Sequence, residues 1–353
     1  MYEVVDIAMH ACIFYARFFL ATALALLCAV AQASMGGTEI VGNAGDGPVT
    51  IFYPSSSDSR PVKRGPFTVQ LASDGVPVRG NGRLVVISHG SGGSPWVHTD
   101  LARALVEAGF VVALPEHRGD NYKDNGSPGP TSWKARPVEV SHAIDAVGLD
   151  KRFAPLLTLH KVGMYGMSAG GHTALTLAGG RWSPARLRQH CEIDIAEDFN
   201  GCVGLAARLT GGRLDGVKKK IALGVIRHRF DDTKWYTHAD PRVVAIVAGV
   251  PYAADFDIAS LATPRVPLAL VTAGQDKWLV PRFHSDLVLR ACASCERLAD
   301  FPNGGHGALL SPLPPGLTGL AGELLNDPPG FDRRTLPEVD RKIVAFFRKN
   351  LLP

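Results

Sequence analysis

The 353-residue sequence has little excess of either charge, no internal repeat and few aromatic residues. Its 37 Lys and Arg residues are nearly balanced by 33 Asp and Glu residues, and no basic stripe with interleaved aromatics occurs. A nucleic-acid partner is therefore not expected, because binding to a phosphate backbone needs a concentrated positive surface. The 38 Gly and 25 Pro residues follow no period. Collagen-like, coiled-coil and wholly disordered chains are thereby excluded, which leaves a globular protein.

The N-terminal apolar run, from Phe18 to Ala31, is too short to span a bilayer, which takes about 20 residues. Arg17 precedes the run, and the small residue Ala33 lies just beyond its end. A positive charge, an apolar run and small residues, in that order, are typical of a cleaved signal peptide. We therefore expect residues 1–33 to direct export, and the mature protein to be periplasmic or secreted without a membrane span. An uncleaved anchor is the alternative.

Four of the six cysteines follow residue 33, and an even number in an exported chain permits two disulfides. Cys191 and Cys202 lie in one charged, loop-like stretch, where a bridge would tie down an insertion. Cys292 and Cys295 have the spacing of a redox or zinc pair, but no second pair or histidine cluster accompanies them. We expect a structural bridge there too, and no metal site.

Alternating strand and helix patterns run through most of the chain. The predicted strands are residues 50–53, 67–71, 83–88, 111–115, 161–165, 243–247, 267–273 and 297–301. The predicted helices are residues 99–108, 137–147, 169–179 and 283–291 and a C-terminal helix capped by Thr335, and residues 55–64 form a predicted polar turn. This alternation is typical of an α/β fold with a mostly parallel central sheet and helices on both faces.

Residues 181–240 interrupt this alternation with a densely charged stretch that includes Lys218-Lys219-Lys220. Structureless connections of this length are rare in compact domains, so the stretch is predicted to be an inserted cap or lid. The resulting organisation is a signal peptide at 1–33, a first core segment at 34–180, the cap at 181–240 and a second core segment at 241–353.

A G-x-S-x-G pattern centred on Ser168 lies where a predicted strand meets a predicted helix. Such a turn forces its serine into a strained conformation, and glycines two residues away on either side avoid a collision with the neighbouring backbone. A serine hydroxyl is a poor nucleophile unless a base takes its proton and a carboxylate orients that base. Ser168 is therefore the candidate nucleophile, and a base and an acid are expected further along the chain.

The expected base and acid follow predicted strands in the order serine, acid, histidine. His306 lies in a glycine-rich loop, and Asp276 follows the strand at 267–273. Both positions are at carboxyl ends of strands, where open α/β sheets carry their ligand sites. Asp255 and Asp257 follow the preceding strand and are alternatives to Asp276 for the acid.

Two backbone N–H groups are also needed to bind the oxyanion that forms during acyl transfer. One is expected from Ala169, the residue after the nucleophile, and the other from Ser91 in the loop His89–Ser94. A dinucleotide-binding turn is the competing interpretation of this loop, but Pro95 stands where that motif needs its third glycine. No cofactor is therefore expected.

With these residues in place, the chain resembles the α/β-hydrolase family, and within it the exported dienelactone hydrolase-like and platelet-activating-factor acetylhydrolase-like esterases. The segments that carry the resemblance are H-G-S-G-G-S at 89–94, G-M-S-A-G-G-H at 166–172, G-Q-D at 274–276, G-G-H at 304–306 and D-P-P-G-F-D at 327–332. They span most of residues 50–350. The resemblance implies a cofactor-free serine hydrolase of carboxylic esters with the α/β-hydrolase fold.

Two departures limit what this resemblance implies. Dienelactone hydrolases use a cysteine where this chain has Ser168, and acetylhydrolase-like members place the acid after an earlier strand, as Asp255 or Asp257 would be. We therefore expect an exported esterase acting on a small or lipid-like ester through Ser168, Asp276 and His306. A peptidase or amidase on the same triad, and a non-catalytic binding protein on a hydrolase scaffold, are the alternatives.

Overall fold

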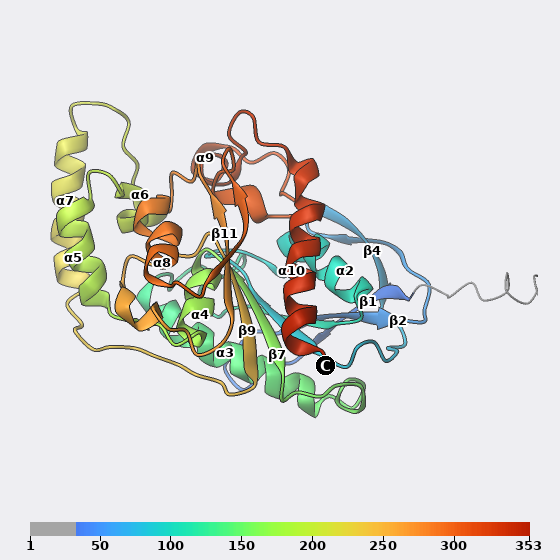
Figure 1. Ribbon diagram of the computed structural model, residues 1–353. Helices are drawn as coiled ribbons and strands as arrows, with labels where there is room; N and C mark the ends of the chain where they lie inside the picture. Colours follow the sequence, from blue (N-terminus) through green and yellow to red (C-terminus); the bar gives the residue numbers. More distant parts are fainter. Residues whose placement is uncertain (1–32) are drawn as a thin grey trace, which may run out of the picture. The chain divides into compact units, whose positions relative to one another are not determined.

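A ten-stranded sheet runs through the part of the chain that the computed structural model describes, residues 33–353 (Figure 1). In spatial order the strands are β12 (Glu296–Phe301), β11 (Leu268–Ala273), β9 (Val243–Gly249), β7 (Val162–Met167), β5 (Leu84–Ser88), β6 (Val111–Pro115), β2 (Val49–Ser55), β1 (Ser34–Ile40), β4 (Phe67–Ser73) and β3 (Arg60–Arg64). The six strands from β12 to β6 are mutually parallel, and β2 joins them antiparallel. This confirms an α/β fold with a mostly parallel central sheet.

Helices cover the sheet on two sides, each over its own apolar cluster. One cluster lies beneath α2 (Thr99–Glu107) and α10 (Leu336–Leu351). The other lies beneath α3 (Pro130–Leu149), α4 (Ala169–Leu177) and α8 (Ser285–Ala291) (Figure 1). The central strands β5, β6 and β7 are buried along their whole length, because helices lie on both of their faces.

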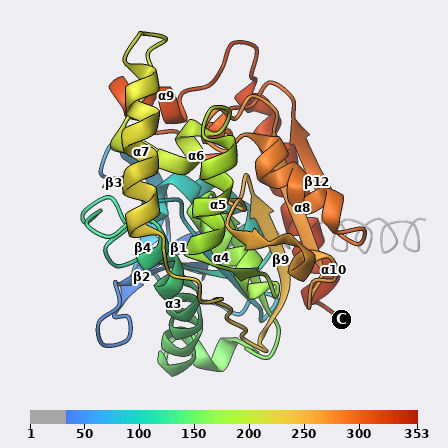
Figure 2. The ribbon, with the colours of Figure 1, turned by 90° about the vertical axis from the view of Figure 1, so that its left-hand side faces the viewer.

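The stretch 181–240 folds into helices rather than the loop expected around its cysteines. It contains α5 (Pro184–Asp194), α6 (Phe199–Val203) and α7 (Asp215–Arg229), which follow α4 and precede β9 along the chain. Figure 2 shows these helices. Its first two residues form β8 (Arg181–Trp182), which pairs with β10 (Phe256–Asp257). The Ser183 hydroxyl accepts a hydrogen bond from the N–H of Ala185, so α5 begins at a regular N-cap.

The two cysteine pairs form the expected bridges. Cys191 in α5 is bonded to Cys202 in α6, and Cys292 to Cys295 just after α8. The first bridge joins two consecutive helices of the 181–240 stretch.

Two local predictions were wrong. The polar turn predicted at 55–64 contains β3, an edge strand in which no residue is buried. The helix predicted to start at Pro137 starts at Pro130, with Pro137 inside it. Proline favours a first helical turn, which is why the pattern indicated a start there. The predicted export signal lies outside the described residues except for Ala33.

Candidate active site

Ser168 lies on the turn between β7 and α4, with φ at 58° and ψ at −115°. This is a region that side-chain-bearing residues rarely adopt, so the surrounding structure must hold it. The two flanking glycines make the turn possible. A Cβ on Gly166 would lie 1.9 Å from the Gly170 oxygen, and one on Gly170 would lie 1.9 Å from the Ser88 oxygen. The turn therefore presents the serine beyond the end of the strand, as the sequence pattern predicts.

The structure brings Ser168, His306 and Asp276 together at the carboxyl ends of their strands. The distance from His306 Nε2 to Ser168 Oγ is 2.9 Å, and from His306 Nδ1 to Asp276 Oδ2 it is 2.8 Å. The other carboxylate oxygen of Asp276 accepts hydrogen bonds from the N–H groups of Trp278 and Leu279, and both N···O distances are 2.8 Å. Since a carboxylate only accepts, the imidazole proton lies on Nδ1, and the lone pair of Nε2 faces the serine hydroxyl.

The two alternative acids contact other residues. Asp255 is fully buried, and its carboxylate lies 3.0 Å from Nε2 of His172. The ring of His172 stacks on Trp133 with centroids 4.8 Å apart. Asp257 forms an exposed ion pair with Arg181. In the structure Asp276 is therefore the carboxylate that contacts His306.

The loop His89–Ser94 lies against the serine. A Cβ on Gly90 would lie 3.8 Å from Ser168 Oγ. Within this loop the N–H of Gly92 donates to Asp120 and that of Gly93 to the Gly90 oxygen, whereas no described hydrogen bond uses the N–H of Ser91. Ala169 is the first residue of α4, where a helix has no internal acceptor for the N–H. Both amides expected to bind an oxyanion are thus left without a described partner.

The loop His89–Ser94 is held by a buried ion pair between Arg136 and Asp120, which the sequence pattern did not reveal. Arg136 in α3 is fully buried. Its guanidinium donates one hydrogen bond of 2.6 Å to the backbone oxygen of His89 and another of 2.9 Å to the Asp120 carboxylate. Asp120 in turn accepts from the hydroxyls of Ser91 and Ser132. Burial acts to raise the pKa of Asp120, but the Arg136 charge and these hydrogen bonds outweigh it and lower the pKa. The carboxylate is therefore ionised and fixed.

A second serine, histidine and acid lie close together beside this network. Ser88 Oγ is 2.6 Å from Nε2 of His117, and Nδ1 of His117 is 2.5 Å from Glu139. All three side chains are buried. Burial lowers the pKa of His117 and raises that of Glu139. Because Ser88 lies within β5 with no exposed surface, this set has the distances of a triad without access for a substrate.

One group of potential metal ligands occurs among the described residues: His190, Asp198 and Cys202, whose ligand atoms lie within 4.8 Å of one another. Cys202 is already bonded to Cys191, so it offers no thiolate. Hydrogen bonds from His190 and from His284 hold Asp198, and they lower its pKa to about 2 against the effect of burial. The group is accounted for by these contacts, and we assign no metal to it.

Comparison of the chain with protein-family models and with curated proteins finds no match. The resemblance to esterases therefore remains a prediction from the motifs. Among residues 33–353, none of the helices combines the length and apolar character that a bilayer crossing requires.

Proposed function

We propose that this protein is a serine hydrolase of carboxylic esters with the α/β-hydrolase fold. The observation that carries the proposal is Ser168 at positive φ between β7 and α4, with its hydroxyl 2.9 Å from an imidazole that a buried carboxylate orients. A serine, a base and an orienting acid in this geometry are recognised by their mutual distances and not by their positions in the sequence.

Each of these groups has a defined role in the mechanism. Ser168 Oγ attacks the ester carbonyl carbon while His306 Nε2 takes its proton, and Asp276 stabilises the imidazolium. The N–H groups of Ser91 and Ala169 bind the oxyanion of the tetrahedral intermediate. Collapse of that intermediate breaks the bond to the alcohol, which leaves with the proton from His306. Water, activated by the same imidazole, then releases the acid from Ser168.

The disulfides support an exported location. Bridges such as Cys191–Cys202 persist in oxidising compartments and are rare where thiols are kept reduced. We accordingly place the protein in the periplasm or outside the cell, with residues 1–33 as its export signal.

A fluorophosphonate probe and a series of p-nitrophenyl esters of rising chain length test the proposal. We expect the probe to label wild-type protein and Ser168→Ala to lose both labelling and hydrolysis, with turnover falling by about 10⁴ to 10⁶. Ser88→Ala is the matched control, because Ser88 has a similar histidine contact but no accessible surface. Its labelling and turnover should stay close to wild type.

The same experiment separates the alternatives. Near-normal ester turnover in Ser168→Ala would overturn the mechanism. Labelling of Ser168 without hydrolysis of any ester, but with cleavage of amide substrates, would assign a peptidase or amidase. Absence of labelling in the folded wild-type protein would favour a non-catalytic binding protein.

A further inference from the structure

Helix α7 has apolar residues on two sides, and within residues 33–353 only one of these sides is covered by other parts of the chain. On the inner side, Ile226 is buried and Ala222 and Leu223 pack against the core cluster. On the outer side, an exposed apolar stripe consists of Leu214, just before the helix, and Val217, Ile221 and Val225, which are 68%, 51%, 63% and 49% exposed. The four are spaced three, four and four residues apart, so they line one side of the helix.

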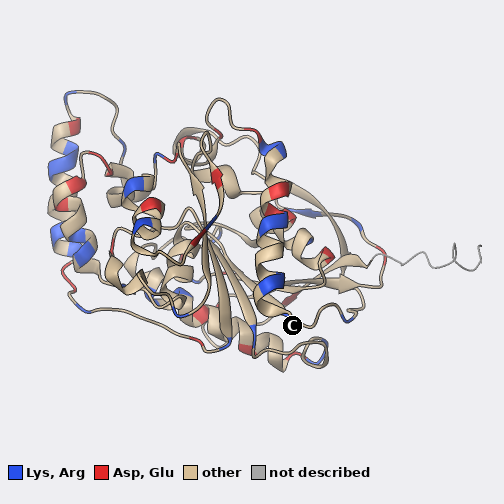
Figure 3. Ribbon diagram, in the orientation of Figure 1, with Lys and Arg blue, Asp and Glu red and all other residues tan. Residues whose placement is uncertain are grey.

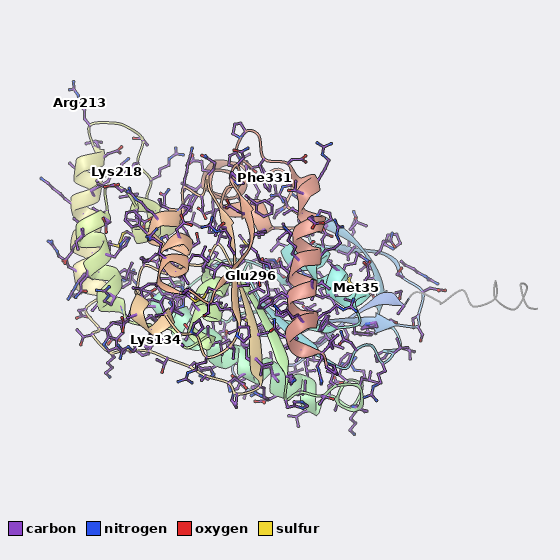
Figure 4. The ribbon with its side chains drawn as sticks, in the orientation of Figure 1. Met35, Lys134, Arg213, Lys218, Glu296 and Phe331 are labelled. Carbon is purple, nitrogen blue, oxygen red and sulfur yellow. A yellow bond between two sulfur atoms is a disulfide. The ribbon has the colours of Figure 1, made fainter. Side chains whose placement is uncertain are left out.

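Basic residues border this outer stripe. Residues 213–229 contain six Lys and Arg residues and a single acidic one, Asp215, although the whole chain is nearly neutral. Lys218 forms an ion pair with Asp215, and Arg227 forms one with Glu192. Among the described residues no ion pair is formed by the other four, which are Arg213, Lys219, Lys220 and Arg229. By helical spacing Arg213, Lys220 and Arg229 lie beside the stripe, whereas Lys219 lies on the side of buried Ile226. The helix lies at an edge of the ribbon, where Arg213 projects outward (Figures 3 and 4).

A partner that covers this apolar stripe must also carry a charge that complements the basic residues beside it. A second copy of the same stripe would bring two strongly basic surfaces together, which electrostatic repulsion opposes. An anionic lipid surface satisfies both features: the aliphatic side chains enter the boundary between head groups and acyl chains, and the basic residues attract the head groups. Each Lys or Arg near such a surface contributes about a fivefold gain in binding.

We propose that the outer stripe of α7 docks the protein on an anionic lipid bilayer surface. This is a binding function of the 181–240 stretch, and it does not depend on the hydrolase proposal, because it requires neither Ser168 nor turnover. Binding is to the surface and not across the bilayer, since α7 is only 15 residues long and has one side packed on the protein.

Co-sedimentation with vesicles tests this, using exported protein and vesicles of phosphatidylcholine alone or mixed with phosphatidylglycerol. We expect binding to the mixed vesicles, little to the neutral ones, and weaker binding as salt rises. Ile221→Glu should weaken binding about tenfold or more, because it replaces an exposed aliphatic side chain that would enter the bilayer boundary. Lys220→Gln should weaken it about fivefold. The matched control is Leu149→Glu, which changes a 79% exposed leucine at the end of α3 and should bind like wild type.

Circular dichroism and thermal unfolding establish that each variant is folded, and Lys220→Gln provides a second test should Ile221→Glu unfold. The proposal is overturned by equal binding to neutral and mixed vesicles, by no binding to either, or by equal losses in Ile221→Glu and Leu149→Glu. A dimer in light scattering that Ile221→Glu dissociates would also overturn it, in favour of self-association. Loss of esterase activity with vesicle binding intact would affect only the hydrolase proposal.

Discussion

The guanidinium of Arg136 and the carboxylate of Asp120 form an ion pair with both side chains completely buried, 2.9 Å apart. Burial lowers the pKa of Arg136, but the Asp120 charge favours its protonated form. The pair is attached to the loop beside Ser168, because Arg136 also donates to the His89 oxygen. A buried charge pair of this kind is expected to fix the loop in one position, which an oxyanion site requires.

We predict that Arg136→Met lowers the free energy of unfolding by about 3 to 5 kcal/mol, since it leaves the Asp120 carboxylate buried without a counter-charge. Adding Asp120→Asn should restore part of that stability. Ester turnover should nevertheless stay about 10² below wild type in the double variant, because the loop has lost its donor to the His89 oxygen. Denaturant unfolding and ester assays on Arg136→Met, Asp120→Asn and the double variant measure both effects. Additive stability losses would contradict an interaction between the two charges.

Asp276→Asn should lower ester turnover by about 10⁴ with a small change in stability, because the amide cannot orient the His306 proton as the carboxylate does. Asp255→Asn is expected to act on stability instead, since Asp255 contacts buried His172. Asp257→Asn removes only an exposed ion pair and should have little effect on either quantity. A deep loss of turnover confined to Asp255→Asn or Asp257→Asn would show that one of these residues is the acid.

The sequence predicted the parts of the fold and site that have a local signal. The strand β6 was expected at its observed bounds because its residues lie in one short apolar run between Gly109 and Glu116. Ser168 was expected on a strand-to-helix turn because glycines flank it at the required spacing. Asp276 and His306 follow apolar strands, and parallel strands bring their carboxyl ends to one edge of the sheet.

The hydrogen-bonded network that joins Arg136 and Asp120 to the loop His89–Ser94 had no such local signal in the sequence. Arg136 is 47 residues from His89 along the chain. The sequence alone does not distinguish a buried arginine from the exposed ones that are far more common. His117 and Glu139 likewise come from separate elements, and only the packed structure shows that they contact each other. The edge strand β3 was missed because three of its five residues are charged and none is buried, so its sequence has no apolar run that would mark a strand.

The two disulfides predict that exported protein, cleaved after Ala33, has no free thiols. Thiol titration under denaturing, non-reducing conditions should therefore give none, and four would contradict both bridges. Replacing Cys191 and Cys202 together by Ala should lower the free energy of unfolding by about 2 to 3 kcal/mol, because the bridge restricts the unfolded chain. The Cys292–Cys295 bridge closes a much shorter loop, so the corresponding double variant should lose less.

We predict that Asp340 in α10 makes the stability of the protein depend on pH between about pH 4 and pH 7. Its partial burial, and to a lesser extent the nearby Asp100 charge, raise its pKa to about 7. In the unfolded chain the carboxyl titrates near pH 4, so between these values the folded state holds the extra proton. Stability from this group is therefore present in full below about pH 4 and is lost as pH rises toward 7.

Asp340→Asn mimics the protonated carboxyl and removes this loss. We expect the variant to be more stable than wild type at pH 8, and its advantage to be about 2 to 3 kcal/mol larger there than at pH 5. Denaturant unfolding of both proteins at the two pH values measures the difference. Glu338→Gln in the same helix is the control: its carboxylate is exposed and pairs with exposed Arg341, so no comparable gain at pH 8 is expected. An advantage of Asp340→Asn that is equal at both pH values would show that better packing, and not the proton, is its source.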